Sequence, residues 1–180
     1  LAERVVEIAP AGLNHTYFVS GGSEGVETAL KLARQDHLLR GHPDKHIVIA
    51  RWRGYHGGSM GAVSATGVPS LRDPFEPWLA NFPHISPCYP YRCQAPGCQG
   101  TCDLSCAREL EQAILAEGPE SVAAVIAEPV VMGGMAAVPA TEDYFQEIRR
   151  ICDAYDVLFI ADEVITGYGR TGRHFAVEHW

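Results

Sequence analysis

Two short, uninterrupted runs of apolar residues constrain the fold of this chain more than any other feature of its sequence. They are VAAVIA at 122–127 and VLFIA at 157–161, and a stretch with helical spacing lies between them. A continuously apolar strand must be covered on both faces, whereas an alternating strand leaves one face to water. Such strands, separated by a helix, are typical of parallel sheets sandwiched between helices. The sequence therefore predicts an α/β fold.

An acidic residue follows each of these runs directly: Glu128 and Asp162. In parallel α/β sheets, ligands bind beyond the carboxyl ends of the strands. A carboxylate beside a buried strand is costly to desolvate unless a cation or hydrogen-bond donors meet it. Asp162 is therefore a candidate partner for a protonated ring nitrogen of a ligand. The structural alternative is a helix cap or a salt bridge to Arg149 or Arg170.

A glycine turn near the N-terminus is a candidate phosphate site. Residues 16–20 (TYFVS) predict a strand, GGS at 21–23 predicts a tight turn, and the apolar spacing that follows predicts a helix up to about Arg40. A short buried strand is expected at 47–50. Glycines let the backbone approach a ligand closely, and the start of a helix offers free N–H groups to an anion. A turn selected only for packing is the alternative.

The same turn also fits the nucleophile elbow of serine hydrolases, because GGSEG at 21–25 matches G-x-S-x-G. Ser23, Asp162 and either His174 or His179 would then form a catalytic triad in that chain order. However, an elbow normally follows several strands and an oxyanion loop, and few residues precede Ser23. A hydrolase is therefore the more remote hypothesis.

The segment GYHGG at 54–58 places an aromatic ring and a histidine between glycines, directly after a predicted strand. Such a loop can present a flat ring to a flat ligand, although simple packing of Tyr55 is the alternative.

The region from about 66 to 103 has no sustained periodicity and is rich in proline and cysteine, so we expect a long insertion that is functional or forms a lid. After it, residues 104–117 predict a helix. Thr141 is expected to cap a further helix that runs to Tyr155.

Five of the six cysteines cluster in this insertion and just after it: Cys88, Cys93, Cys98, Cys102 and Cys106. Their close spacing is compatible with a metal, yet it lacks the C-x2-C pairs of zinc ribbons. We therefore expect reduced thiols and no metal site. A cysteine-rich metal-binding module remains the non-enzymatic alternative.

The charge of the chain and the lack of long apolar runs exclude several kinds of partner. The formal net charge is −8 and the isoelectric point is near 5.4, so no basic surface is available for nucleic acid. No apolar run approaches the ~18 residues of a membrane span, and no leader segment is recognisable. We expect a cytoplasmic protein. Because the chain begins at Leu1 and stops at Trp180, we also expect it to be the central fragment of a longer polypeptide.

Four sequence blocks resemble one enzyme family closely. FVSGGSEGVETALKLAR, GYHGG, VIAEPV and FIADEVITGYGRTG, the last followed by FAVEHW, are similar to successive blocks of the class III aminotransferases, of the ω-amino acid type (subgroup II). They extend from about Phe18 to Trp180. The resemblance implies the type I fold of the transferases that depend on pyridoxal 5′-phosphate (PLP). Residues 1–180 would then be part of the PLP-binding large domain, with its mostly parallel sheet and covering helices.

The resemblance also implies roles for individual residues. Gly22 and Ser23 would hold the phosphate of PLP, Tyr55 would stack on one face of its pyridine ring, and Val164 would contact the other face. Asp162 would pair with the ring nitrogen, where a protonated pyridinium acts as the electron sink of the reaction.

His56 and Glu128 match positions near the cofactor or the substrate. Many relatives have glutamine where this chain has Ile165, so the contact of that glutamine with the phenolic oxygen of the cofactor must be lost or replaced. Only two lysines occur, Lys31 and Lys45, and neither resembles the lysine that binds PLP covalently in the family. That lysine and the small C-terminal domain are expected outside this chain.

The implied function is transfer of an amino group between an amine or an ω-amino acid and a 2-oxo acid by a homodimer or tetramer. A PLP-dependent decarboxylase or aminomutase of the same fold is the alternative. The fragment alone is expected to be inactive.

Overall fold

The computed structural model describes residues 1–93 and 102–180, and its centre is a parallel sheet of four strands. In spatial order these are β2 (His84–Ile85), β1 (Ile47–Arg51), β3 (Val122–Ala127) and β6 (Leu158–Ala161). All three neighbouring pairs run parallel, with Val125 opposite Ile49 on one side and opposite Phe159 on the other. The predicted α/β class is therefore confirmed.

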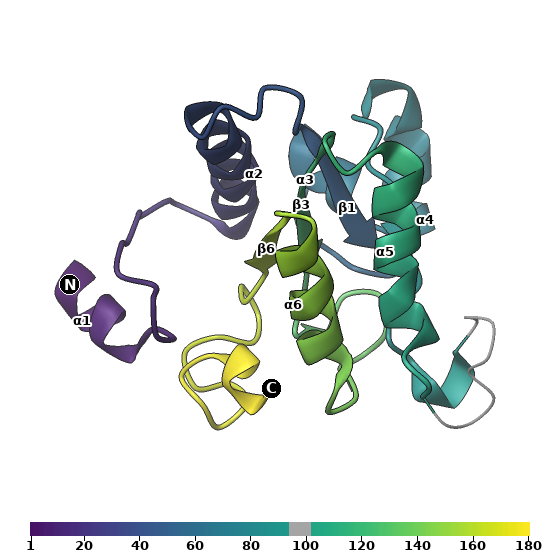
Figure 1. Cartoon of the computed structure of the whole chain (residues 1–180). Helices are drawn as coiled ribbons and strands as arrows, with labels where there is room; N and C mark the ends of the chain where they lie inside the picture. Colours follow the sequence, from purple (N-terminus) through teal and green to yellow (C-terminus); the bar gives the residue numbers. More distant parts are fainter. Residues whose placement is uncertain (94–101) are drawn as a thin grey trace.

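Helices cover both faces of this sheet (Figure 1). One face packs against α2 (Gly22–Leu39) and α3 (Met60–Ala65), and the other packs against α5 (Ser105–Glu117) and α6 (Tyr144–Ala154). Within β3, Val125 belongs to the hydrophobic cluster on the α5 and α6 side, and the next residue, Ile126, belongs to the cluster on the α2 and α3 side. Successive strand residues point to opposite faces, so a strand between two helical layers must be apolar at every position.

The remaining elements are short. They are α1 (Ala2–Ile8), α4 (Pro69–Arg72), an antiparallel pair formed by β4 (Val130–Val131) and β5 (Val138–Pro139), and the 3-10 turns Asp73–Trp78, Pro90–Arg92 and Ala176–His179. Figure 1 shows α1 and the segment after it standing apart from the layered body. Among the described residues, no helix combines the length and the apolarity that are needed to cross a bilayer.

The strand predicted at 16–20 is not formed. These residues follow an extended path without regular pairing, and Tyr17 and Phe18 are exposed by 73% and 56%. A β-branched and aromatic composition favours a strand only where a neighbouring strand accepts its hydrogen bonds. Within the described residues no strand lies alongside this segment.

Two further expectations need correction. The insertion is not entirely a loop, because His84 and Ile85 form the edge strand β2 against β1. Thr141 does not cap the last helix; α6 is preceded by Asp143. The Thr141 side chain instead contacts two cysteine sulfurs. Cys98 and the rest of 94–101 lie outside the described residues.

Candidate active site

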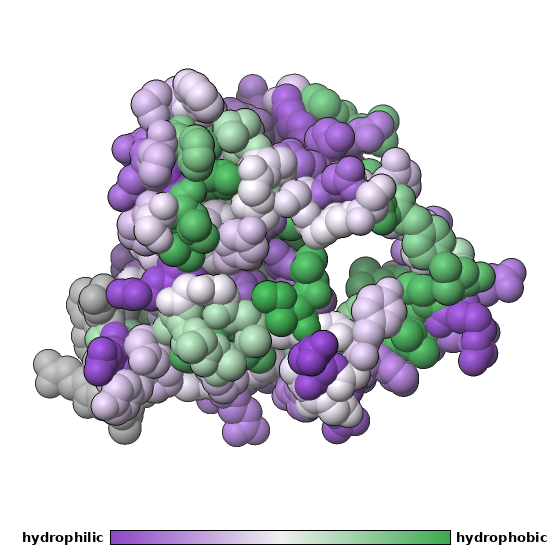
Figure 2. All heavy atoms as spheres, turned by 180° about the vertical axis from the view of Figure 1, so that it is seen from behind, coloured by the Kyte–Doolittle hydropathy of each residue, from purple (hydrophilic) through white to green (hydrophobic). Residues whose placement is uncertain are grey.

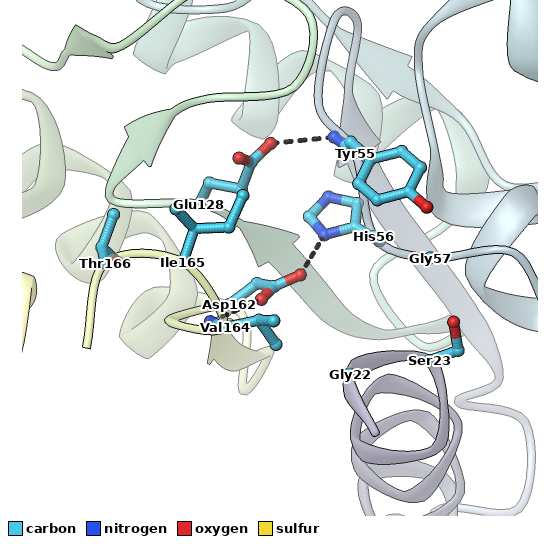
Figure 3. Close-up of a pocket in the computed structure, with 10 residues that line it drawn as sticks. All are labelled: Gly22, Ser23, Tyr55, His56, Gly57, Glu128, Asp162, Val164, Ile165 and Thr166. Carbon is cyan, nitrogen blue, oxygen red and sulfur yellow. Dashed lines mark hydrogen bonds and ion pairs between the residues drawn. The ribbon is translucent and has the colours of Figure 1, made fainter. Parts of the chain in front are cut away.

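One pocket of about 240 Å³ lies at the carboxyl ends of β1, β3 and β6. It brings together all seven residues that the sequence indicated as cofactor contacts, although they come from four separate stretches of the chain (Figure 3). The lining consists of Gly22, Ser23, Tyr55, His56, Gly57, Glu128, Asp162, Val164, Ile165 and Thr166.

Asp162 is held from two sides directly after β6. Its Oδ2 accepts a hydrogen bond from His56 Nδ1 at 2.7 Å, and its Oδ1 accepts one from the Val164 backbone N–H at 3.1 Å. The side chain is only 5% exposed. Neither structural alternative for Asp162 is realised: no helix begins at Asp162, and within the described residues neither Arg149 nor Arg170 forms an ion pair with it. The result is a buried carboxylate with a fixed orientation at the pocket wall.

His56 is fully buried and has one ring nitrogen left over. Its backbone N–H donates to Thr66 Oγ1 at 3.0 Å, which fixes the loop that carries the ring. An ionised carboxylate can only accept hydrogen bonds, so His56 Nδ1 carries the proton shared with Asp162. Within the described residues, Nε2 is buried and meets no hydrogen-bond partner. Buried polar atoms of this kind are uncommon and occur where a ligand or a water completes the site.

Glu128 shapes the pocket through the backbone. Its Oε1 accepts the backbone N–H of Tyr55 at 2.8 Å, and its Oε2 accepts that of Met132 at 3.0 Å. The buried guanidinium of Arg51 donates to the Glu128 carbonyl oxygen. Oε1 therefore holds the Tyr55 loop against the end of β3, and Oε2 holds the backbone at Met132, just after β4.

Ser23 lies in the first turn of α2 and contacts the GYHGG loop. Its Oγ accepts a hydrogen bond from the Gly58 backbone N–H at 3.0 Å. Gly57 has φ +129°, in the region that favours glycine, and a Cβ there would overlap Ser23 Oγ. Within the described residues, no side chain caps the start of α2 at Gly21. The first N–H groups of a helix lack intrahelical partners, so this end can bind an anion.

Tyr55 and Val164 approach the pocket from different sides (Figure 3). Val164 packs against the start of α2, because a Cβ on Gly22 would lie 3.0 Å from Val164 Cγ1. Tyr55 and Val164 are 39% and 64% exposed. A flat ligand between them would cover apolar surface on both of its faces.

The geometry does not support the serine hydrolase hypothesis. Asp162 is bonded to His56 rather than to His174 or His179, and His179 Nε2 contacts the backbone oxygen and the hydroxyl of Thr171. A triad requires a histidine that links the carboxylate to the serine. His56 Nδ1 donates to Asp162, but the hydrogen bond to Ser23 Oγ comes from the Gly58 backbone N–H. No histidine therefore links Asp162 to Ser23 within the described residues.

Neither lysine lines the pocket. Lys45 precedes β1, at the opposite end of the sheet, and its ammonium donates to the backbone oxygens of Pro119, Val122 and Tyr155 at 3.0 Å each. Burial lowers the pKa of Lys45. Lys31 is exposed on α2. Neither lysine is therefore placed to reach a ligand in this pocket.

Three lining residues were not predicted as contacts: Gly57, Ile165 and Thr166. The glycine-rich sequence around Gly57 could have indicated it, since a tight loop must bring its backbone close to another element. Thr166 is buried and donates to Glu163, which also accepts the N–H groups of Ala176 and Val177. No local signal in the sequence marks Thr166, because its burial depends on how the turn after β6 folds back.

Comparisons with known proteins agree with each other. The family model for "Aminotransferase class-III" matches residues 1–180. The chain is 39% identical over 180 residues to putrescine–pyruvate aminotransferase of Pseudomonas aeruginosa, covering 100% of this chain and 39% of that protein. It is 40% identical over 184 residues to diaminobutyrate–2-oxoglutarate transaminase of Halomonas elongata, covering 100% of this chain and 39% of that protein.

A solved transaminase from the marine bacterium Virgibacillus superposes with a TM-score of 0.87 at 40% identity, covering 99% of this chain and 38% of the other. The chain thus spans about two fifths of the length of the relatives that it matches.

Proposed function

The chain belongs to the class III aminotransferase family, and from this premise we propose that the full-length protein uses PLP to move an amino group between an amine or ω-amino acid and a 2-oxo acid. Its fold is that of the type I PLP-dependent transferases, as in the solved transaminases that it resembles. The observation that carries the proposal is the buried carboxylate of Asp162, oriented at the pocket by His56 and by the Val164 N–H.

The donor set of the pocket fits PLP. When bound, PLP supplies an electron sink for the charge that is left when a proton leaves the substrate carbon. Asp162 is placed to pair with the protonated ring nitrogen, and its two hydrogen bonds fix the orientation of its carboxylate. Because the Asp162 side chain is almost completely buried, water screens its charge little, and the attraction between the carboxylate and a ring cation is correspondingly stronger.

We assign the two faces of the ring to Tyr55 and Val164. Glu128 contributes by holding the Tyr55 backbone in place rather than by touching the ring. Packing of apolar groups on both faces excludes water and orients the ring relative to Asp162.

We assign the phosphate to the uncapped start of α2, with Gly22 and Ser23 as its contacts. Gly57 allows the GYHGG loop to lie directly against Ser23, so that this loop and the start of α2 together form the proposed phosphate site. The partial positive charge of the helix start favours a dianionic group there. Many relatives have glutamine at the position of Ile165. Because isoleucine cannot donate a hydrogen bond from its side chain, another group must donate one to the phenolic oxygen of PLP.

The remaining assignments are also proposals. The lysine that binds PLP covalently and the small C-terminal domain belong outside these 180 residues. Putrescine is the donor named for one relative, so a diamine or an ω-amino acid is the proposed donor class.

We propose a cytoplasmic homodimer or tetramer. In support, exposed apolar side chains gather on the N-terminal segment, at Leu13, Tyr17, Phe18 and Val19 (Figure 2).

An amino-transfer assay tests the proposal directly. The full-length protein, loaded with PLP, is incubated with putrescine or an ω-amino acid and with pyruvate or 2-oxoglutarate, and alanine or glutamate is quantified. We expect the amino acid to form only when both substrates are present. If the PLP-loaded protein releases carbon dioxide from its substrate without forming amino acid, the decarboxylase alternative replaces the proposal. Labelling of Ser23 by a phosphonate would instead revive the hydrolase hypothesis.

A further inference from the structure

Three cysteine thiols meet outside the pocket. Cys88 follows β2, Cys102 precedes α5, and Cys106 lies in the first turn of α5. Their three Sγ atoms all lie within 4.8 Å of one another. Cys88 and Cys106 are 1% and 0% exposed, and the described cysteines are free thiols. The proposed function uses none of them.

The spacing of the sulfurs fits a single ion. A tetrahedral zinc site has Zn–S bonds of about 2.3 Å, which places neighbouring sulfurs about 3.8 Å apart. Small side-chain rotations bring three sulfurs that are already within 4.8 Å to this separation. In an iron–sulfur cluster, several iron and sulfide atoms lie between the cysteines, so the cysteine sulfurs must be farther apart than they are here.

Thr141 supplies hydrogen bonds to these sulfurs. Its backbone N–H donates to Cys88 Sγ at 3.5 Å, and its hydroxyl donates to Cys102 Sγ at 3.6 Å. Donors around the sulfurs stabilise the thiolate form, which is the form that binds metals, and they orient the ligands. Thr141 is thus positioned to orient these cysteines, as outer hydrogen bonds do in metal sites.

We propose that Cys88, Cys102 and Cys106 bind one Zn²⁺ ion, and that Cys93, which lies outside this close group of sulfurs, moves in as the fourth ligand. Structural zinc sites are almost always four-coordinate, and Cys93 is half-buried against the same hydrophobic cluster. The ion releases the thiol protons to solvent as it binds. Thiolate-rich sites select zinc over hard cations such as Mg²⁺. This proposal replaces the sequence-based preference for metal-free thiols and is independent of the proposed aminotransferase function.

The site has a structural consequence. A bound ion would connect the proline-rich insertion to the start of α5. Through Thr141, it would also connect the insertion to the segment that precedes α6. The same insertion places Ser86, Tyr89 and Arg92 along a second cavity, which they share with Trp52 and Arg53 beside the Tyr55 loop. A zinc ion would thus hold one wall of this cavity in place.

Metal analysis of the full-length protein tests the proposal. The protein is produced in zinc-supplemented medium, desalted in the presence of a weak chelator, and analysed for zinc and iron by mass spectrometry. We expect close to one zinc per chain and an iron content below about a tenth of that ratio. Cys88→Ser and Cys106→Ser should each lower the zinc ratio at least about tenfold.

Cys152→Ser is the matched control. Cys152 is fully buried in the same hydrophobic cluster but does not belong to the thiol group, and burial raises its pKa to about 12. This variant should keep its zinc. Absence of zinc from the wild-type protein, iron in its place, a disulfide among the cluster cysteines, or equal zinc loss in Cys152→Ser would each overturn the proposal.

A wild-type experiment covers the case in which the serine variants do not fold. A mercurial reagent is titrated into the zinc-loaded protein while a zinc-sensitive dye reports release. We expect zinc to be released in step with modification of the cluster thiols. Substitution by Co²⁺ should also give the red d–d absorption of a tetrahedral thiolate site, in a range where PLP does not absorb. Thiol modification without metal release would refute the site.

Discussion

His56 Nδ1 lies 2.7 Å from Asp162 Oδ2, and both side chains are buried although 106 positions separate them in the sequence. The histidine lies on the loop after β1, and the aspartate lies directly after β6. Since β3 separates these two strands in the sheet, the hydrogen bond connects the loop after β1 to the end of β6 and fixes the orientation of the carboxylate.

Asp162→Ala should slow chemistry much more than it weakens PLP binding. Without the carboxylate, the ring nitrogen is no longer held protonated, so an interaction that matters chiefly in the transition state is lost. We expect kcat and kcat/KM to fall together by about a hundredfold or more. The single-turnover rate of amino transfer in the full-length, PLP-loaded variant measures this. Asp153→Ala on the exposed face of α6 is the control. A folded, PLP-loaded Asp162→Ala that reacts at the parental rate would exclude the role.

His56 should act by positioning Asp162, and two substitutions separate this role from packing. His56→Leu removes the donor to Asp162 and leaves one carboxylate oxygen buried without a partner, at a cost of about 1–3 kcal/mol. His56→Asn can place an amide N–H near the position of Nδ1. We expect kcat to fall about tenfold or more in His56→Leu and to recover partly in His56→Asn, with the dissociation constant of PLP changing less. Equal kcat values in the two variants would point to packing instead.

Ser23→Ala should weaken retention of PLP while the fold is kept. Loss of one hydrogen bond to a charged phosphate costs about 1.5–3 kcal/mol, which corresponds to a roughly 10- to 150-fold rise in the dissociation constant. Equilibrium dialysis, with PLP detected by absorbance, gives this constant. Ser105→Ala, at the start of α5 and outside the pocket, should leave it unchanged. If Ser23→Ala binds PLP as the parent does, the phosphate assignment is wrong.

His37 should make stability depend on pH. Its ring is fully buried on α2, with Nε2 2.9 Å from the Ala123 carbonyl oxygen, and burial lowers its pKa below the ordinary value of about 6.5. Between that lowered pKa and about 6.5, the unfolded chain binds more protons than the folded one, so the free energy of unfolding falls as the pH falls through this window.

Urea unfolding of the full-length protein at about pH 7.5 and about pH 5 measures this effect. The loss of stability on acidification should be smaller in His37→Gln, which cannot be protonated. His15→Gln, at an exposed position, should behave as the parent does. Identical losses in the parent and in His37→Gln would contradict the prediction.

The sequence alone determined the layered architecture. The runs at 122–127 and 157–161 are apolar at every position because both of their faces are covered, and this property can be read without a structure. The positions of Glu128 and Asp162 followed from the same reasoning, since ligands collect where parallel strands end. Helical spacing likewise indicated α2, α5 and α6 to within a few residues.

Tertiary structure decided which groups those residues meet. Spacing along the chain carries no information about the hydrogen bond from His56 to Asp162, or about the use of both Glu128 oxygens on backbone N–H groups. Thr141 matched a cap by composition, yet it lies beside the sulfurs of Cys88 and Cys102. The strand expected at 16–20 failed for a related reason: a strand depends on a neighbouring strand that can be distant in sequence, and only the packed fold places that partner.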